Sequence, residues 1–209
     1  MARSNSQMQF DVSYVSRIMR KIHIFSAMPV LVLMVFFAIT GIYLNHPDWK
    51  GGDVEKQQQT IALPKSLTDL PDWSTHYASH SLTLLHWLDV EHGVSGVDFE
   101  IDWDELDSLV ILNLSGPNGS TLIEAFIEEG QAHVDTRRLS LIDMLNNIHR
   151  AKHVSGLWRM LSDISAICMV LFSISGFWLV LVNRMERKNA NIALLLGSSL
   201  FVFTITLMH

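Results

Sequence analysis

The chain contains little charge and almost no cysteine. Of its 209 residues only 17% are charged, 49% are hydrophobic, and Cys168 is the single cysteine. One cysteine cannot form an intrachain disulfide or an all-cysteine zinc or iron–sulfur site. The low charged fraction and the positive mean hydropathy of +0.25 exclude a disordered chain and argue against nucleic-acid binding. Phosphate-binding loops, HExxH motifs and serine–histidine–acid arrangements are also missing, so hydrolase chemistry has no support.

Long uncharged runs are what the sequence has instead. Three stretches lack any charged side chain, Ile24–Leu44, Ile164–Val182 and Asn189–His209. At 1.5 Å per residue each can cross a hydrocarbon layer of roughly 30 Å as a helix. The first run is too long for a cleaved signal peptide and has no small-residue cleavage site, so it is retained. Glycine, serine and threonine dilute the third run, which either crosses fully or packs against the other two.

The distribution of charge predicts the orientation of these spans. Residues 1–23 carry a net charge of +3 and the short loop after the second span +2, whereas residues 45–159 carry −10. Lysine and arginine concentrate on the cytoplasmic side of membrane proteins. The expected order is given by the following segments: 1–23 cytoplasmic, 24–44 span one, 45–159 periplasmic, 160–182 span two, 183–189 cytoplasmic, and 190–209 span three. We therefore expect a multi-pass protein of the bacterial inner membrane with a cytoplasmic N-terminus.

The segment between the first two spans is long enough for a small α+β domain. It opens with an irregular stretch that includes Gln57–Gln59, followed by a helix over Thr75–His92 with Ser74 as its cap. Alternating apolar and acidic residues from Val97 to Asp104 predict a half-buried strand. The pattern then predicts further strands over 109–114, 121–128 and 132–135, and a helix from Leu139 that leads into the second span. Gly116–Gly119 is typical of a tight turn.

Several of these segments resemble the PepSY domain and the transmembrane proteins associated with it. The matching stretches are Gly130–Thr136 before the returning helix, Ile22–Ser26, Phe36–Trp49, Asn146–Gly156 and Ser175–Trp178. The resemblance implies three transmembrane helices with a small α+β, PepSY-like extracytoplasmic domain between spans one and two. Ala151 stands where the family pattern leads us to expect a glycine.

Ten histidines suggest a metal or haem site, and their spacing restricts the combinations. His23 and His46 lie at opposite ends of span one, roughly 34 Å apart along a helix, so they cannot serve one centre. His149 and His153 are four residues apart, which would place both on one face of a helix. Such a pair can chelate an ion but cannot supply both axial ligands of a haem. A haem would therefore use His46 with either His149 or His153.

Three interpretations of these histidines remain open at this point. His46 with His149 or His153 ligates a haem b, or all three bind a copper or zinc ion, or all three are interfacial residues that cap helices and bind carbonyl groups. The family resemblance favours haem, because larger members resemble inner-membrane reductases associated with ferric-siderophore reduction. Small members accompany periplasmic proteins that carry flavin.

The resemblance thus implies a redox protein that passes electrons to a periplasmic flavoprotein or a ferric complex. The alternative is a haem-free, membrane-anchored PepSY module that binds a periplasmic or membrane partner. A cytoplasmic-side haem at His23 has no second histidine in this chain, so it would need a homo-oligomer, a partner subunit, or a methionine such as Met19 or Met185.

Two further groups of polar residues have weaker functional interpretations. Asp163, at the start of span two, is either a functional carboxylate or the N-terminal cap of the helix, and Arg159 is four residues earlier, in reach of an ion pair if the helix is continuous. His76 and His80 are also four residues apart, and either bind a metal or lie on a solvated helix face. The acidic run of residues 98–107 lacks the glycine of a calcium loop, so it is expected to be a solvated strand face.

Overall fold

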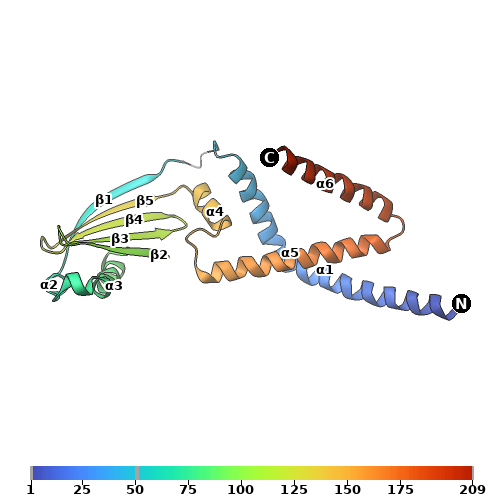
Figure 1. Ribbon diagram of the computed structural model, residues 1–209, viewed down its shortest axis with the longest axis horizontal. Coiled ribbons are helices and arrows are strands. Elements are labelled where there is room, and N and C mark those ends of the chain that lie inside the picture. The colour runs from blue at the N-terminus through green and yellow to red at the C-terminus, as the bar shows by residue number, and fades with distance from the viewer. Residues whose placement is uncertain (1, 50–51, 209) are drawn as a thin grey trace. The chain divides into compact units, whose positions relative to one another are not determined.

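The computed structural model describes residues 2–49 and 52–208, with side chains described from residue 12 onward. Six helices and five strands are present in this part of the chain (Figure 1). In chain order they are α1 (Ala2–Asn45), β1 (Glu55–Ala62), α2 (Lys65–Thr68), α3 (Trp73–His92), β2 (Asp98–Asp104), β3 (Leu109–Gly116), β4 (Gly119–Phe126), β5 (Gln131–Arg138), α4 (Leu141–His149), α5 (Gly156–Val182) and α6 (Arg187–Leu207). The chain divides into two compact units, residues 36–160 and a helical unit made by the remainder.

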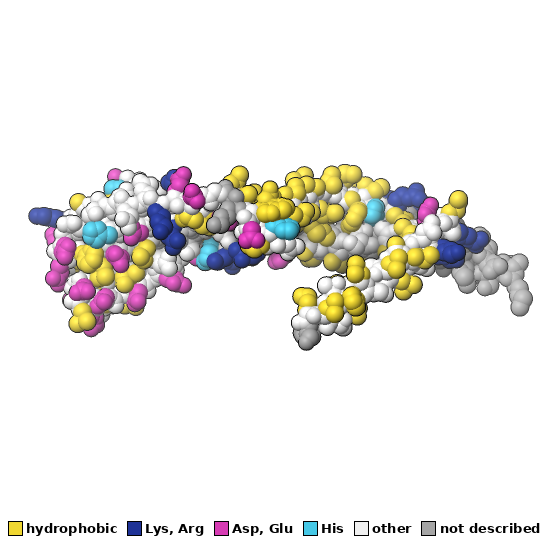
Figure 2. All heavy atoms as spheres, turned by 90° about the horizontal axis from the view of Figure 1, so that it is seen from above, with side chains coloured by type: hydrophobic (Ala, Val, Ile, Leu, Met, Phe, Trp, Pro, Cys, Tyr) yellow, Lys and Arg dark blue, Asp and Glu magenta, His cyan; other side chains and the backbone are white. Residues whose placement is uncertain are grey.

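Three helices are long and apolar enough to cross a membrane: Val12–Asn45 of α1, Gly156–Val182 and Arg187–Leu207. Most of their large apolar side chains are exposed, as the hydrophobic surface of the helices in Figure 2 shows. Such an apolar surface is favourable in lipid and costly in water. The protein is therefore a multi-pass membrane protein. His209, the expected last residue of the third span, lies outside the described residues.

The five strands form one antiparallel sheet in the order β1-β5-β4-β3-β2. The strands β2 to β5 follow the predicted meander, and residues 116–119 make the predicted turn between β3 and β4. The strand β1 was not predicted, because Glu55–Thr60 is polar and was assigned to an irregular stretch. It pairs with β5 over eight residues, from Glu55 opposite Arg138 to Ala62 opposite Gln131. Backbone pairing with β5, rather than an apolar pattern, makes this segment a strand.

One face of the sheet carries the hydrophobic core. Val110, Leu112 and Ile123 point toward α3, whose Leu84 and Leu88 are fully buried. On β2, Ile101 and Trp103 pack against this core. The acids between these apolar residues point to the opposite face, so the predicted solvated acidic strand face is confirmed.

The start of α3 differs from the prediction in its capping residue. The helix begins at Trp73, and Asp72 rather than Ser74 occupies the N-cap position, with a positive φ of 54°. Trp73 is buried in the core and its indole Nε1 donates a hydrogen bond to the carbonyl oxygen of Leu67. Burial of this side chain starts the helix at Trp73, two residues before the predicted first residue Thr75.

The connection between the sheet and the membrane is not one continuous helix. α4 ends at His149, and α5 begins only at Gly156. Between them, Ala151 and His153 both have φ of +51°, a conformation that favours glycine. Ala151 therefore adopts the backbone conformation for which the family pattern suggested a glycine. The expectation that His149 and His153 share one helix face is wrong, because the helix ends between them.

Candidate functional site

His149 is the last residue of α4 and its ring lies against the C-terminal end of α1. Ser140 caps this helix, since its Oγ accepts a hydrogen bond from the amide of Asp143. The ring Nδ1 of His149 lies 2.6 Å from Oγ1 of Thr40, and the ring of Phe37 stands edge-on at a centroid distance of 5.1 Å. A Cβ added to Gly41 would lie 3.6 Å from Cε1 of His149. One turn of α1 thus forms the surface against which this imidazole packs.

The hydrogen bonds of Thr40 determine which nitrogen of His149 carries the proton. Thr40 is buried, and its hydroxyl donates to the carbonyl oxygen of Phe36 at 2.7 Å. Because that single proton is used, Oγ1 must accept from His149, which places the proton on Nδ1. Nε2 of the neutral ring therefore keeps its lone pair. Burial, and secondly the nearby charge of Arg150, lowers the pKa of His149 below its ordinary value of 6.5.

The lowered pKa predicts that stability falls as the pH falls. Below pH 6.5 the unfolded chain binds a proton at His149 that the folded chain does not bind, so acid favours the unfolded state. Thermal unfolding of the purified full chain, followed by tryptophan fluorescence between neutral and mildly acidic pH, should show this loss. His149→Gln should flatten the pH dependence, and His76→Gln should not. An equally steep dependence in His149→Gln would contradict this protonation scheme.

His46 follows directly after α1, as predicted, but its ring has different neighbours from that of His149. It is exposed and stacks on Trp49 with a ring-centroid distance of 4.3 Å and an interplanar angle of 12°. It also lines a cavity of about 420 Å³ whose opposite wall comes from α4 and includes Asp143, Asn146 and Arg150. The two histidines therefore lie on the same end of α1 without sharing a described partner.

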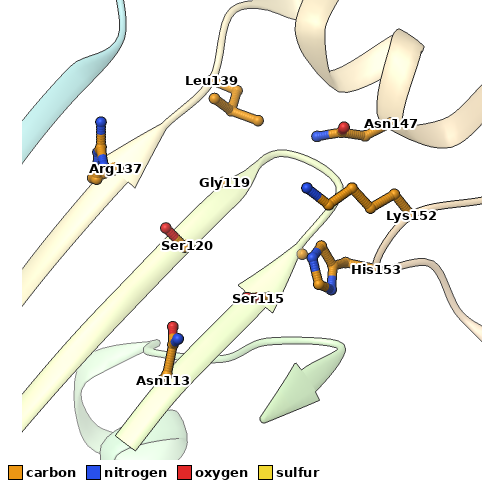
Figure 3. Close-up of a pocket in the computed structure, with 10 residues that line it drawn as sticks. Asn113, Ser115, Gly119, Ser120, Arg137, Leu139, Asn147, Lys152 and His153 are labelled. Carbon is orange, nitrogen blue, oxygen red and sulfur yellow. The ribbon is translucent and has the colours of Figure 1, made fainter. Parts of the chain in front are cut away.

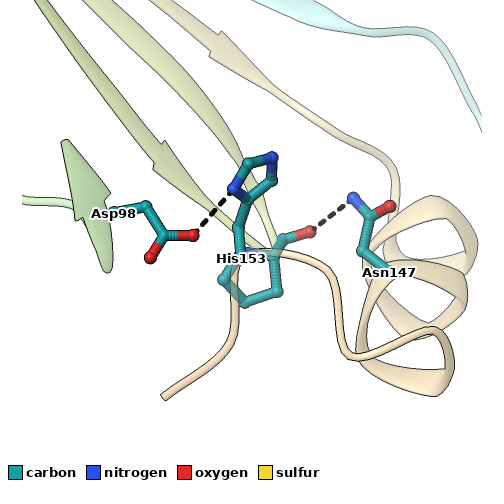
Figure 4. Close-up of polar contacts among 4 residues, drawn as sticks. Asp98, Asn147 and His153 are labelled. Atoms are coloured by element: carbon teal, nitrogen blue, oxygen red, sulfur yellow. Dashed lines mark hydrogen bonds and ion pairs between the residues drawn. The ribbon is translucent and has the colours of Figure 1, made fainter. Parts of the chain in front are cut away.

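His153 is bound to the sheet domain rather than directed at α1. Its Nδ1 donates to Oδ2 of Asp98 in β2 at 2.9 Å (Figure 4). Nearby, Nδ2 of the buried Asn147 donates to the carbonyl oxygen of Pro117 in the β3–β4 turn at 3.1 Å. Oδ1 of the same side chain accepts from Nη2 of Arg150 at 3.0 Å. These contacts fasten α4 and the following loop to the sheet.

His23 contacts α5 within the helical unit. Its Nδ1 lies 3.1 Å from the carbonyl oxygen of Phe172, and the two rings stack at 4.3 Å. Ser175 is buried beside it, and a Cβ added to Gly176 would come within 3.0 Å of the His23 ring. The missing side chain of Gly176 lets this imidazole approach the helix. No second histidine is among the described neighbours of His23.

Among the described residues, no group of three or more histidine, cysteine, aspartate or glutamate side chains has the geometry to hold a metal ion. His46, His149 and His153 each have their own contacts at the end of the domain that joins the membrane helices. The three-histidine copper or zinc site therefore has no preformed cluster in this part of the chain. The imidazoles of His46, His149 and His153 are instead held by different partners.

Sequence comparison adds a family to this geometry. The model of the family described as PepSY_TM-like matches residues 14–209. The chain belongs to the PepSY_TM-like family. No curated protein and no solved structure matches it.

The remaining predicted residues of this PepSY_TM-like protein lie apart from the site. Asp163 is exposed in the third turn of α5, seven residues after its first residue, so it does not cap the helix. It has no ion-pair partner among the described residues. On α3, the rings of His76 and His80 lie 5.9 Å apart, and Nε2 of His80 binds the carbonyl oxygen of Pro71.

Sequence reasoning missed the residues of this PepSY_TM-like chain that position the histidines. Thr40 and Asn147 lie inside segments quoted for the family resemblance, yet neither residue type indicates a contact with a distant histidine or turn. The position of Thr40 inside span one, six residues from the midpoint of residues 24–44, was the available signal, because a hydroxyl in a spanning helix needs partners.

Proposed function

We propose that this PepSY_TM-like protein is a redox protein of the bacterial inner membrane that binds haem b at its periplasmic face through His149. In this proposal the N-terminus is cytoplasmic, as the excess of lysine and arginine in residues 1–23 and after α5 favours. The protein would pass electrons to a periplasmic flavoprotein or a ferric complex such as a ferric siderophore. A bound haem supplies a one-electron carrier that alternates between ferric and ferrous iron.

The contact between Thr40 and the His149 ring, 2.6 Å from Oγ1 to Nδ1, is the observation that carries this proposal. Histidines that ligate metals almost always donate their other ring N–H to an oxygen, which fixes the orientation of the ring. Thr40 provides this contact and leaves Nε2 of His149 unprotonated. The lowered pKa keeps the ring neutral, as ligation to iron requires. Of the two ligands that the sequence left open, His149 is favoured over His153, whose ring is bound to Asp98.

The second axial ligand is proposed to be His46. It is the other histidine at this end of α1, six residues or roughly 9 Å of helix beyond Thr40. Its ring is exposed and stacks on Trp49, and no hydrogen bond to a described residue holds it in place. A homo-oligomer in which each copy contributes one His149 is the other source of a second ligand.

Visible spectroscopy tests this proposal directly. The full chain, produced with haem supplied and purified in mild detergent, should show a Soret band that shifts on reduction. His149→Ala should abolish the band, His46→Ala should abolish or alter it, and the matched control His76→Ala should leave it unchanged. Absence of a Soret band from the unmodified chain, or an unchanged spectrum in His149→Ala, would overturn the assignment.

A haem-free anchored binding module is the second candidate function. The observation in its favour is the sheet face opposite α3, which no helix of the described domain covers and which carries registered rows of mainly polar side chains. One such row has four polar residues, Asp102, Glu124, His133 and Thr60, with Ile111 between the first two. If the purified chain lacks haem, specific retention of a periplasmic partner by the full chain, lost on charge reversal at Glu124, would support this function.

A further inference from the structure

We propose that the sheet domain carries a binding site for the phosphate headgroup of an anionic phospholipid, built around Arg137 and Lys152. The site is a hollow of about 380 Å³ at the end of the open sheet face that adjoins α4 (Figure 3). Three of its residues are register partners on adjacent strands, Ser115 on β3, Ser120 on β4 and Arg137 on β5. Lys152 and His153 reach it from the loop after α4.

The chemistry of the lining selects an anion. Arg137 and Lys152 are exposed, and neither side chain has an ion-pair or hydrogen-bond partner among the described residues. Hydroxyl groups of Ser115 and Ser120 and the amide of Asn113 add hydrogen-bond donors. No acidic side chain belongs to the described lining. The adjacent acid Asp98 already accepts the hydrogen bond of His153 at 2.9 Å.

Arg137 and Lys152 bring two cations together in a segment that is acidic overall. Residues 45–159 carry a net charge of −10, with 18 acids and eight bases. Two cations lining one hollow form a local positive site within this acidic segment. A guanidinium and an ammonium beside hydroxyl groups match a phosphate, since arginine binds its oxygens in pairs and lysine adds a compact charge.

The chain connection between the site and α5 favours a lipid as the source of the phosphate. His153 precedes the first residue of α5 by three residues, a chain reach of at most about 11 Å. Trp158, in the first turn of α5, donates from Nε1 to the carbonyl oxygen of Ile148 at 2.9 Å and thereby holds the first turn of α5 beside α4. Tryptophan is enriched at the level of lipid headgroups. Lys152 and His153 are therefore only a few residues of chain from a tryptophan suited to the headgroup level.

Native mass spectrometry of the full chain in nonionic detergent tests the site. Phosphatidylglycerol should bind more tightly than phosphatidylcholine. Lys152→Gln should weaken phosphatidylglycerol binding about fivefold, and the double variant Arg137→Gln with Lys152→Gln about 25-fold. The matched control Lys65→Gln removes an exposed lysine of α2 at the distal end of the domain and should have no effect. The basic residues of the segments proposed to be cytoplasmic contribute the same background binding of phosphatidylglycerol in every variant.

Three results would overturn the proposal. They are equal binding of the two lipids, wild-type binding of phosphatidylglycerol by the double variant, and a loss in Lys65→Gln as large as in Lys152→Gln. Inorganic phosphate tests the other source of the same group. If phosphate alone raises the melting temperature of the chain as much as phosphatidylglycerol does, the site binds free phosphate rather than a headgroup. Far-UV circular dichroism melts confirm that the double variant is folded.

Discussion

Gly119→Ala should destabilise the sheet domain by about 4 kcal/mol. The domain should then no longer be stably folded at physiological temperature, and its cooperative unfolding transition should be lost. The glycine has φ of +152°, and a Cβ at this position would collide with the carbonyl oxygen of Arg137 on β5. Backbone strain costs roughly 1–3 kcal/mol and overpacking against a rigid neighbour a similar amount. The backbone oxygen cannot move away without breaking the β4–β5 pairing. Tryptophan fluorescence of the full chain, whose core contains Trp73, reports this unfolding.

Gly130→Ala is the matched control for this prediction. Gly130 also has a positive φ, of +67°, but a Cβ there would have no neighbour within 4 Å. This variant should lose only the conformational advantage of glycine, about 1 kcal/mol. If Gly119→Ala and Gly130→Ala melt at the same temperature, the close approach of β4 to Arg137 is not real.

Asn147→Ala should cost about 2–3 kcal/mol and release α4 from the sheet. The side chain is buried and bonds both the Pro117 carbonyl oxygen and the guanidinium of Arg150. Truncation leaves the carbonyl oxygen of the half-buried Pro117 without its side-chain donor and Arg150 without its acceptor, which costs about 1–3 kcal/mol. Hydrogen exchange of the full chain should show faster exchange at the amides of α4. The melting temperature of the domain should also fall.

The neighbouring residue provides a control of the same chemistry. Oδ1 of Asn146 is buried without a hydrogen-bond partner among the described residues. Asn146→Ala should therefore be near neutral or slightly stabilising, because it removes an unsatisfied acceptor. An equal loss in both alanine variants would mean that helix packing, and not the Asn147 contacts, holds α4 to the sheet.

The features that could be predicted from the sequence are those in which a local pattern and the tertiary environment agree. Residues 24–44 carry no charge because lipid surrounds them, and the same run is helical in α1. Ile101 and Trp103 alternate with acids because only one face of β2 meets the core, whereas Phe99 at the start of the strand is exposed. In both cases burial acts on each residue separately, so the pattern is visible in the chain alone.

Two features could not be predicted because distant partners determine them. β1 has no strand-like pattern over Glu55–Thr60, and its pairing with β5 comes from a segment more than 70 residues away. The break after His149 contains neither glycine nor proline in residues 149–155. Hydrogen bonds of Asn147 and His153 to the sheet stabilise the positive φ of Ala151 and His153 instead.

The candidate site was predictable in its residue types and not in their grouping. His46 and His149 were correctly placed at the same end of span one, which follows from helix length. Their separate contacts, with Trp49 and Thr40, depend on side-chain directions that spacing does not reveal. The hydrogen bond between His153 and Asp98 depends on the break between α4 and α5. No local sequence signal marks this break.

The pairing of β1 with β5 has a mechanical consequence for the domain. β1 follows α1 and β5 precedes α4 and α5, so the strands attached to the first two membrane helices are hydrogen-bonded neighbours. Both attachments lie at the same end of the antiparallel ladder, where Glu55 faces Arg138. A lateral pull on the two helices would therefore load this ladder in the peeling direction, one residue pair at a time. Shear across all eight pairs at once, the geometry that resists force best, does not arise in this topology.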